Sequence, residues 1–436
     1  MMNTYAAVIE YLYARLPMFT RDGAAAIKKD VDNTLQFCQV LDNPHQKFKS
    51  IHIAGTNGKG SSSHMLASIF AAAGYKTALY TSPHLLDFRE RIRINGAMIP
   101  EAEVVAFINQ HKDYIETLEP SFFEVTVAMA FDYFAKEKVD IAIIEVGLGG
   151  RLDSTNIIQP EVSLITNIGM DHMNLLGDTL EEIAFEKAGI IKAHTPVVVS
   201  ENDPKLTSLF TDRAASLDAP LSFAVEHLAV KQVERENGGQ VITIEQRATK
   251  ETKTWFLDLA GSYQQKNILG VLTVVEEMRA QGWKLSDAQV QAGLQAVQTA
   301  TGLQGRWQTL SEEPRIICDT GHNEDGVREV VKNLALTTFK RLHVVIGAMR
   351  DKDLSHMLPL LPNDANYYFC SPTMPRAMPA DMLKAQAADL GMHGDVYRTI
   401  GDALAAAKAA YAEGDLIFIG GSNFVVAEAL AIIQKD

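Results

Sequence analysis

The stretch His52-Ile53-Ala54-Gly55-Thr56-Asn57-Gly58-Lys59-Gly60-Ser61-Ser62 decides the fold of the first part of this chain. An apolar run from Ile51 to Ala54 leads into closely spaced glycines and a lysine, and apolar residues at helical spacing follow from Met65 to Ala73. This order is typical of a strand, a phosphate-binding loop and a helix. Backbone N–H groups, the helix N-terminus and the Lys59 ammonium all favour phosphate oxygens. The stretch therefore predicts a site for a nucleoside triphosphate.

The loop departs from the general phosphate-loop pattern at two positions. That pattern has a glycine five residues before the Gly-Lys pair and a Ser or Thr directly after it, where this chain has Ile53 and Gly60. A glycine-rich turn without a ligand is the alternative, and the strand before and the helix after the loop argue against it. The order Gly-Thr-Asn-Gly-Lys resembles the loop of ATP-dependent amide ligases of the Mur ligase superfamily.

Length and charge limit the class of protein. The chain has 436 residues, enough for two or three domains, and a formal net charge of −14 from 40 basic and 54 acidic residues. This charge argues against nucleic acid or an acidic membrane surface as the main partner, and it leaves room for an anionic small substrate in a locally basic cleft.

Cysteine usage and hydropathy indicate a cytoplasmic protein. Cys38, Cys318 and Cys370 are widely spaced and form no Cys-x-x-Cys pair, so neither a disulfide framework nor a cysteine metal site is indicated. We see no signal peptide near the N-terminus and no run of about 18 apolar residues that would predict a membrane span.

Short apolar runs alternate with helical patterns through the first half of the chain. Thr77–Tyr80, Val139–Ile144 and Val162–Ile168 are typical of buried strands, and polar or glycine-rich turns follow them. This pattern predicts a P-loop-type α/β domain with a mostly parallel sheet. From Leu221 to Leu259 short alternating segments surround Asn237-Gly238-Gly239, which predicts a small antiparallel meander attached to this domain.

A second α/β series follows a helix whose start carries the capping-box pair Ser286 and Gln289. We predict a first domain at 1–298, a linker at 299–305 and a smaller Rossmann-like domain at 306–436. The second domain is expected to contain a helix at Ala405–Ala410 and the strands Arg315–Cys318, His343–Ile346, Tyr367–Cys370 and Leu416–Ile419.

Polar groups at the carboxyl ends of the predicted strands carry the chemistry, because open α/β sheets bind ligands at that edge. Ser82 offers a hydroxyl ligand for Mg²⁺, or it only starts the turn before Pro83. Glu145 supplies the hard oxygen that Mg²⁺ requires, although a lone acid in this place is often a cap or a solvated residue. His172 is a second metal ligand, a substrate contact or a structural histidine.

Lys187 falls within an apolar pattern. Thr179 and Glu182 predict a capping box, and Ile183, Ile190 and Ile191 would be helical neighbours of the lysine. Burial would lower the pKa of the amine and make its neutral form available to react. The alternative is an ammonium that extends past the isoleucines to water.

Taken together, these motifs resemble the folylpolyglutamate synthase and dihydrofolate synthase family within the Mur ligase superfamily. The segments that carry the resemblance span most of the chain: Leu41–Pro44, Gly55–Ser61, Thr81–Leu85, Glu90–Ile92, Glu145–Asn156, Met170–His172, Lys187–Lys192, Gly261–Asn267, Gly305–Arg306, Asp319–Asn323 and Gly421–Ser422.

The resemblance implies roles for these residues in binding ATP and two Mg²⁺ ions. Thr56, Asn57, Gly58, Lys59, Gly60 and Ser61 would bind the ATP phosphates, and Asn267, Arg306 and Asp319 would also contact ATP. Ser82 and Glu145 would hold one Mg²⁺, and His172 would bind a second together with Glu145. Lys187 would be carbamylated.

The resemblance also implies a substrate region. Its residues would be Phe122, Phe123, Glu124, Leu152, Asp153 and Ser154 for the pterin, with Arg91 also on the substrate side, and His322 and Ser422 for glutamate or interdomain contacts. Two departures affect the glutamate pocket: the family's Asp-Gly-Ala-His-Asn is Asp319-Thr320-Gly321-His322-Asn323 here, and the aromatic often found after Gly-Ser is displaced to Phe424.

The implied activity is ATP-dependent ligation of L-glutamate to dihydropteroate, to folates, or to both, through an acyl phosphate, with Lys59, Glu145, His172, Lys187 and Arg306 as the catalytic set. Arg306 lies beyond the predicted linker, so we expect domain closure to complete the site, and we expect a monomer. A cell-wall ligase of the Mur type is disfavoured because only 54 residues precede Gly55. The other alternative is a non-catalytic phosphate-loop switch protein.

Overall fold

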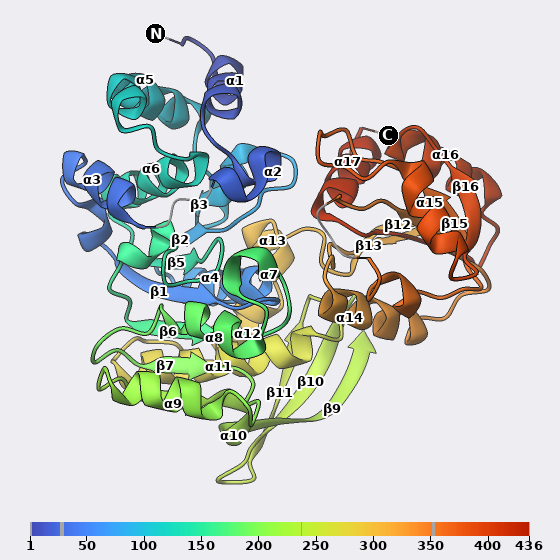
Figure 1. The fold of residues 1–436 in the computed structure, drawn as a ribbon. Helices are drawn as coiled ribbons and strands as arrows, with labels where there is room; N and C mark the ends of the chain where they lie inside the picture. The colour runs from blue at the N-terminus through green and yellow to red at the C-terminus, as the bar shows by residue number, and fades with distance from the viewer. Residues whose placement is uncertain (1, 27–29, 237, 351–353, 436) are drawn as a thin grey trace. The chain divides into compact units, whose positions relative to one another are not determined.

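The computed structural model describes residues 2–26, 30–236, 238–350 and 354–435. The chain divides into two compact units, shown in Figure 1. The first consists of Met1–Glu236, Gln240–Asp258 and Gln264–Leu303, and the second of Asn237–Gly239, Leu259–Tyr263 and Gln304–Asp436. The segment Leu259–Tyr263 therefore groups with the second unit, whereas the sequence places it in the first predicted domain.

The main sheet of the first unit is mostly parallel, as predicted. Its strands are β1 (Lys49–Ala54), β2 (Thr77–Tyr80), β3 (Ile92–Ile94), β4 (Ala97–Met98), β5 (Ile141–Glu145), β6 (Val162–Ile165), β7 (Val197–Val199) and β8 (Leu221–Phe223). Within the described residues these eight strands lie in the order β4-β3-β2-β5-β1-β6-β7-β8. The neighbouring strands of β2-β5-β1-β6-β7-β8 pair in parallel. At the β2 side, β3 and β4 extend the sheet by antiparallel pairing.

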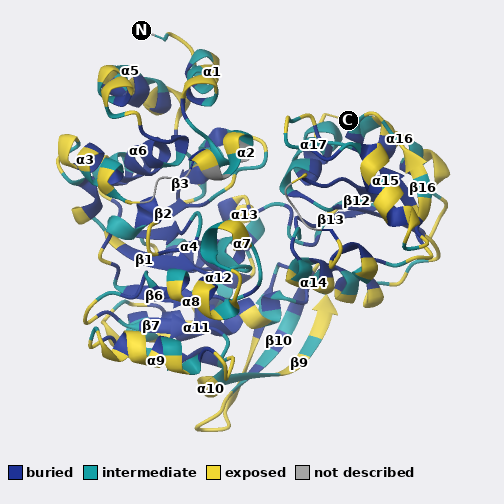
Figure 2. Ribbon diagram, in the orientation of Figure 1, coloured by how far each residue is buried: buried dark blue, intermediate teal, exposed yellow. Residues whose placement is uncertain are grey.

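Helices cover both faces of this sheet, and its central strands are buried, dark blue in Figure 2. Helices α4 (Lys59–Ala72) and α11 (Gln264–Ala280) contact the sheet along one face. The hydrophobic cores of the other face include residues of α6 (Phe122–Lys136), α8 (Leu180–Ala188) and α9 (Thr207–Ala215). The remaining helices of this unit are α1 (Tyr5–Arg15), α2 (Phe19–Asp22), α3 (Asp32–Val40), α5 (Glu101–Leu118), α7 (Met173–Leu176), α10 (Ala224–His227), α12 (Asp287–Leu294) and α13 (Val297–Thr301).

The predicted meander is present but starts later than expected. Strands β9 (Leu228–Glu236), β10 (Gly239–Gln246) and β11 (Thr252–Leu257) form a sheet in the order β11-β10-β9, with β10 and β11 antiparallel. Leu221, where the meander was expected to begin, instead starts β8, which pairs in parallel with β7. The reason is that Leu221 and Phe223 pack on the core of the main sheet.

The second unit is a smaller α/β domain with a mixed sheet. Its strands are β12 (Gln308–Glu312), β13 (Arg315–Cys318), β14 (Leu342–Ile346), β15 (Asn366–Phe369), β16 (His393–Val396) and β17 (Leu416–Gly420), and its helices are α14 (Glu324–Ala335), α15 (Ala380–Ala388), α16 (Ile400–Ala410) and α17 (Asn423–Ile433). The described strands lie in the order β12-β13-β17-β14-β15-β16, parallel except for the edge strand β12. All four strands predicted from sequence are present.

The segment predicted as a linker, 299–305, is partly helical. Helix α13 runs to Thr301 and ends at Gly302, whose positive φ of 70° is a conformation that glycine adopts at low cost. The two units divide after Leu303. The first residues of the predicted linker thus belong to a helix of the first unit.

Cys38, Cys318 and Cys370 are buried free thiols. In the part of the chain that the structure describes, no helix combines the length and the apolar character needed to cross a membrane.

Candidate functional site

The predicted phosphate loop connects β1 to α4, and two of its glycines cannot be replaced without strain. Gly55 has φ +148°, and a Cβ atom there would lie 1.9 Å from the Thr166 hydroxyl oxygen. Gly58 has φ +87°, and a Cβ atom would lie 2.3 Å from Asn267 Oδ1. The tight curvature of the loop therefore depends on glycine at both positions.

A second loop, which follows β6, holds the phosphate loop in shape. The Thr56 N–H donates to the Asn167 carbonyl oxygen at 3.0 Å, and the Asn57 N–H donates to Asn167 Oδ1 at 2.7 Å. The Thr166 hydroxyl donates to the Asn57 carbonyl oxygen at 2.6 Å. Because Thr56 and Asn57 use their N–H groups within the protein, the first N–H groups of α4 are the better donors to an anion, since they have no acceptor inside the helix.

Two lysine ammonium groups converge on one carbonyl of this loop. Lys59 Nζ donates to the Gly55 carbonyl oxygen at 2.9 Å and to that of Thr56 at 3.1 Å. Lys187 Nζ donates to the same Gly55 oxygen at 2.9 Å, and the residue is only 3% exposed. Burial, and then the charge of Lys59, lower the pKa of Lys187 to about 7.

The surroundings of Lys187 differ from those expected. Helix α8 ends at Ala188, so Ile190 and Ile191 lie beyond it and are not helical neighbours of the lysine. Lys187 is buried because its side chain reaches the phosphate loop, and not because it lies in an isoleucine stripe. The alternative of an ammonium extending to water is wrong, whereas the predicted capping box of Thr179 and Glu182 is confirmed.

The low pKa of Lys187 predicts a pH-dependent stability. The unfolded lysine keeps its proton up to its ordinary pKa of 10.5, and the folded one releases it near 7, so the folded state binds fewer protons between these values. The stability of the protein should therefore rise as pH increases from about 7 to about 10 and change little from this source below 7. Urea midpoints of wild type and Lys187→Met, measured across this range in carbonate-free buffer, should diverge as pH rises. Parallel curves would contradict the prediction.

Ser82 and Glu145 lie together beside the phosphate loop. Glu145 ends β5, pairs in register with Ile53 of β1 and is 4% exposed. The Ser82 N–H donates to Glu145 Oε2 at 3.1 Å. A largely buried carboxylate next to a serine, at the strand ends nearest the loop, fits Mg²⁺, which takes one or two protein carboxylates and completes its shell with water and phosphate oxygens.

His172 belongs to the loop that follows β6. Its backbone is left-handed, with φ 51°, and its ring packs edge-on against Phe19 at 5.5 Å between centroids. Its Nε2 lies 3.9 Å from Asp171 Oδ2. Among the described residues, no group of three or more His, Cys, Asp and Glu side chains is placed to hold a metal ion, so a metal here would need ligands from serine, water or substrate.

Asn267 reaches the phosphate loop through a hydrogen-bonded chain that the sequence analysis missed. Asn267 Nδ2 donates to Gln264 Oε1 at 2.8 Å, and Gln264 Nε2 donates to the Ser61 hydroxyl oxygen at 3.0 Å. Gln264 is fully buried on the first turn of α11. Its position three residues before Asn267, on the same helical face, is the signal that could have identified it.

The predicted pterin residues come from two segments that pack together. A Cβ atom at Gly147, in the loop after Glu145, would lie 2.4 Å from the Phe123 ring, so this loop lies against the start of α6. Glu124 and Ser121 form the capping box of α6, and the buried Glu124 Oε1 has no hydrogen-bond partner among the described residues. An unsatisfied buried carboxylate oxygen is a candidate acceptor for a polar ligand.

The second of these segments contributes Leu152, Asp153 and Ser154. Leu152 is 37% exposed, and Asp153 and Ser154 are buried. Asp153 accepts the Leu148 N–H at 2.9 Å and the Thr155 hydroxyl at 2.5 Å, so its carboxylate holds the loop in shape. Burial raises the pKa of Asp153.

Arg91 is a buried cation of the first unit that packs against Phe122, a residue of the predicted pterin region. It is 6% exposed, and its guanidinium carbon lies 5.3 Å from the centroid of the Phe122 ring. In the described part of the chain no carboxylate lies within ion-pair distance of Arg91. A buried guanidinium without a carboxylate partner points to an anionic ligand.

The second unit contains the remaining candidates. Asp319 is 3% exposed and accepts the Tyr263 hydroxyl at 2.7 Å, the Trp307 N–H at 2.8 Å and the Gly321 N–H at 2.8 Å. Arg306, the neighbour of Trp307, donates to the Thr320 hydroxyl oxygen. Asp319 therefore holds the segment before β12 that carries Arg306. Tyr263 is a partner that was not identified from the sequence.

His322 and Ser422 lie on two loops of the same unit. His322 Nδ1 lies 3.1 Å from the Thr320 carbonyl oxygen. Ser422 is the N-cap of α17, and its hydroxyl oxygen accepts the Val425 N–H at 3.2 Å. The helix-capping bond gives Ser422 a structural role whether or not it contacts a ligand.

Family models match both halves of the chain. The Mur ligase middle domain matches residues 53–275, and the Mur ligase glutamate ligase domain matches 305–423. The dihydrofolate synthase/folylpolyglutamate synthase of Bacillus subtilis is 33% identical over 389 residues, covering 86% of this chain and 87% of the relative. The chain belongs to the folylpolyglutamate synthase and dihydrofolate synthase family.

Solved structures of this family match over nearly the whole chain. Escherichia coli FolC in complex with DHPP and ADP has a TM-score of 0.86 at 28% identity and covers 99% of this chain and 98% of that one. The bifunctional folylpolyglutamate synthase/dihydrofolate synthase of Yersinia pestis, complexed with AMPPNP and Mn ion, has a TM-score of 0.84 at 30% identity, with the same coverage. These complexes are consistent with ATP and a divalent metal as the ligands of this family member.

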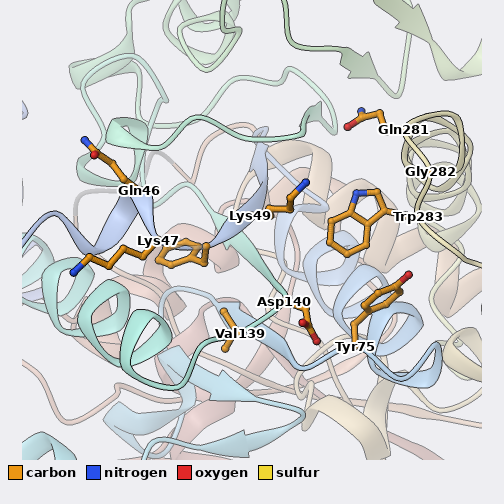
Figure 3. Close-up of a pocket in the computed structure, with 10 residues that line it drawn as sticks. Gln46, Lys47, Lys49, Tyr75, Val139, Asp140, Gln281, Gly282 and Trp283 are labelled. Atoms are coloured by element: carbon orange, nitrogen blue, oxygen red, sulfur yellow. The ribbon is translucent and has the colours of Figure 1, made fainter.

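A hollow lies where β1 and β5 begin, at the end of these strands opposite the phosphate loop. Its volume is ≈ 690 Å³, and Figure 3 shows its lining, formed by Gln46, Lys47, Phe48, Lys49, Tyr75, Val139, Asp140, Gln281, Gly282 and Trp283. Lys49 Nζ lies 5.5 Å from the Trp283 ring centroid and 3.3 Å from Glu161 Oε2, and Lys47 Nζ lies 2.5 Å from Asp42 Oδ2. Both cations have protein partners, so we assign no ligand to this hollow.

Proposed function

We propose that this chain is an ATP-dependent, ADP-forming ligase that joins L-glutamate to dihydropteroate, to folyl(poly)glutamate, or to both. The observation that carries the proposal is the pair Ser82 and Glu145 beside the phosphate loop, with the buried cation Arg91 close by in sequence and in the same unit. A phosphate loop, a metal-binding carboxylate and an anion-binding arginine are the parts that activation of a carboxylate by ATP requires. Relatives with this activity in their names support the same reading.

The reaction has two steps. The carboxylate of the pterin-linked substrate attacks the γ-phosphorus of ATP, which releases ADP and gives an acyl phosphate. The amine of L-glutamate then attacks the acyl carbon, phosphate leaves, and the amine loses a proton. Lys59 and the N–H groups at the start of α4 hold the phosphates, and Arg91 orients the substrate. When bound, Mg²⁺ at Ser82 and Glu145 would supply charge neutralisation, and a second ion at His172 is part of the proposal.

Lys187 is proposed to be carbamylated. A neutral amine can add to CO₂, and the lowered pKa of Lys187 supports a neutral amine near physiological pH. The carbamate would place a negative charge near Lys59, whose ammonium contacts the same Gly55 carbonyl oxygen as Lys187. Lys187→Ala should lose at least about 10-fold in kcat, and added acetate or propionate should restore part of it. If Lys187→Ala keeps full activity, the carbamate has no role in catalysis.

Other parts of the proposal concern the second unit and the whole protein. Arg306 and Asp319 are proposed as further ATP contacts, and His322 and Ser422 as glutamate-side residues. A monomeric state, a cytoplasmic location and the absence of a nucleic-acid partner stay predictions.

The deciding experiment is an assay of ADP release with two acceptors side by side. ATP, Mg²⁺ and L-glutamate are mixed with the protein and either dihydropteroate or tetrahydrofolate. Release that needs both glutamate and a pterin substrate supports the ligase and tells which acceptor is used. ATP hydrolysis independent of glutamate and of both acceptors would favour a nucleotide-binding switch protein instead.

A further inference from the structure

A chain of hydrogen bonds leads from the buried Arg91 to the N-terminal helix. Arg91 Nε donates to His84 Nδ1 at 2.8 Å, and His84 Nε2 lies 3.1 Å from the Tyr13 hydroxyl oxygen. The three residues come from different parts of the first unit: Tyr13 from α1, His84 from the loop after β2, and Arg91 from the turn before β3. We propose that His84 and Tyr13 are positioning residues that hold Arg91 in the orientation needed to bind the pterin-linked substrate.

The hydrogen bond from Arg91 to His84 defines the tautomer of the His84 imidazole. A guanidinium nitrogen is always a donor, so His84 Nδ1 must be the acceptor and the ring proton must reside on Nε2. Nε2 then donates to the Tyr13 hydroxyl oxygen. Each ring nitrogen of His84 therefore has a fixed donor or acceptor role, and flipping the imidazole ring would break both hydrogen bonds.

The same contact determines which part of Arg91 remains for a ligand. The guanidinium presents its donors in a rigid planar fork, and a carboxylate can bind either to the Nε edge or to the two terminal nitrogens. Because His84 occupies Nε, a substrate oxygen or carboxylate must use the terminal nitrogens. The Tyr80 hydroxyl is a further hydrogen-bond partner of the Arg91 side chain. No ion pair of Arg91 is found among the described residues, and one hydroxyl cannot use all the terminal N–H groups, so donors of the terminal fork remain for a ligand.

Aromatic contacts further restrict the orientation of the Arg91 guanidinium. The Arg91 guanidinium lies over the Phe122 ring, and Tyr13 packs on the same ring with 5.7 Å between centroids. The Tyr13 and His84 rings stack nearly parallel, at 6.4 Å and 8°. Phe122 thus forms one wall of the Arg91 site and belongs to the predicted pterin region, so an orientation set by His84 acts on the substrate side and not on the nucleotide side.

This inference rests on the proposed function, and a set of four variants separates the two. His84→Leu removes the acceptor, His84→Asn keeps an oxygen acceptor near the position of Nδ1, and Tyr13→Phe removes only the hydroxyl. Tyr11→Phe is the matched control, since Tyr11 lies on the same helix and contacts Lys112 instead. The readouts are the KM values for the pterin acceptor, ATP and L-glutamate, together with kcat.

We expect His84→Leu to raise the KM for the pterin acceptor about tenfold, with the KM values for ATP and glutamate and kcat changed by less than about twofold. Tyr13→Phe should raise the same KM about threefold, His84→Asn should recover most of the loss, and Tyr11→Phe should match wild type. This split marks positioning of one substrate, because general damage to the fold would affect all three KM values.

Two results would overturn the positioning role: an unchanged KM for the acceptor in both His84→Leu and Tyr13→Phe, or an equal rise in all three KM values. If His84→Leu does not fold, as judged by thermal melting, Tyr13→Phe and His84→Asn decide the question, with acceptor affinity measured by equilibrium dialysis without ATP. Wild-type protein that releases no ADP in the presence of glutamate and acceptor would instead refute the proposed function.

Discussion

Replacing Lys59 with methionine is expected to lower kcat by about 10²- to 10³-fold, the usual cost of removing one preorganised charge from a reacting group. Lys59 contacts two carbonyls of the phosphate loop and is the first residue of α4, so we expect its ammonium to reach the terminal phosphates of bound ATP. Methionine keeps the length and the helix propensity of the side chain. Steady-state ADP release measures the loss.

The matched control for this variant is Lys49→Met. Lys49 begins the strand that ends at the phosphate loop, so it lies at the other end of β1, and its side chain is 58% exposed. Its loss should leave kcat within about twofold, because an exposed pair such as Lys49 and Glu161 contributes little. Full activity of Lys59→Met, with the fold intact by circular dichroism, would contradict the nucleotide-binding role of the loop.

Replacing Glu145 with glutamine is expected to lower kcat by at least about 10²-fold and to raise the Mg²⁺ concentration needed for half-maximal activity. Glutamine has nearly the same shape and keeps an oxygen that can accept the Ser82 N–H, so the fold should be retained. Only the negative charge is lost, and with it the attraction for the metal. A magnesium titration of ADP release tests the prediction.

Glu137→Gln is the control for Glu145→Gln, because Glu137 is an exposed acid of the same unit that pairs with Lys76. It should behave as wild type across the titration. An unchanged magnesium requirement in Glu145→Gln would exclude Glu145 as a ligand and would leave Ser82 and His172 without the carboxylate that the proposed site needs.

The sequence predicts the parallel sheet well because each central strand is an apolar run with its own turn signal. β2 and β13 begin and end where the pattern places them. β6 ends three residues early, since Thr166 and Asn167 leave the sheet to bond with the phosphate loop. The sequence of residues 162–168 does not by itself mark the end of the strand, because pairing with the neighbouring strand decides where the strand stops.

The site is predictable where one motif contains the whole interaction, and it is not where two distant segments meet. Gly55 to Ser61 indicates a phosphate loop by itself. Lys187 is buried as predicted, but the cause is that its side chain bonds to the carbonyl oxygen of Gly55, which is far away in sequence. Tyr13 and His84 could not be paired from the sequence, because their contact depends on where α1 lies relative to the end of β2.

The two-unit division also has a consequence for how the chain is made. Residues Leu259–Tyr263 belong to the second unit, yet the helices α11 to α13 that follow them return to the first. During synthesis the first unit can therefore be complete once Leu303 has emerged, while Tyr263 still lacks Asp319, its later hydrogen-bond partner. We infer that the first unit can fold on the ribosome while it already carries Leu259–Tyr263, a segment that joins the second unit only later.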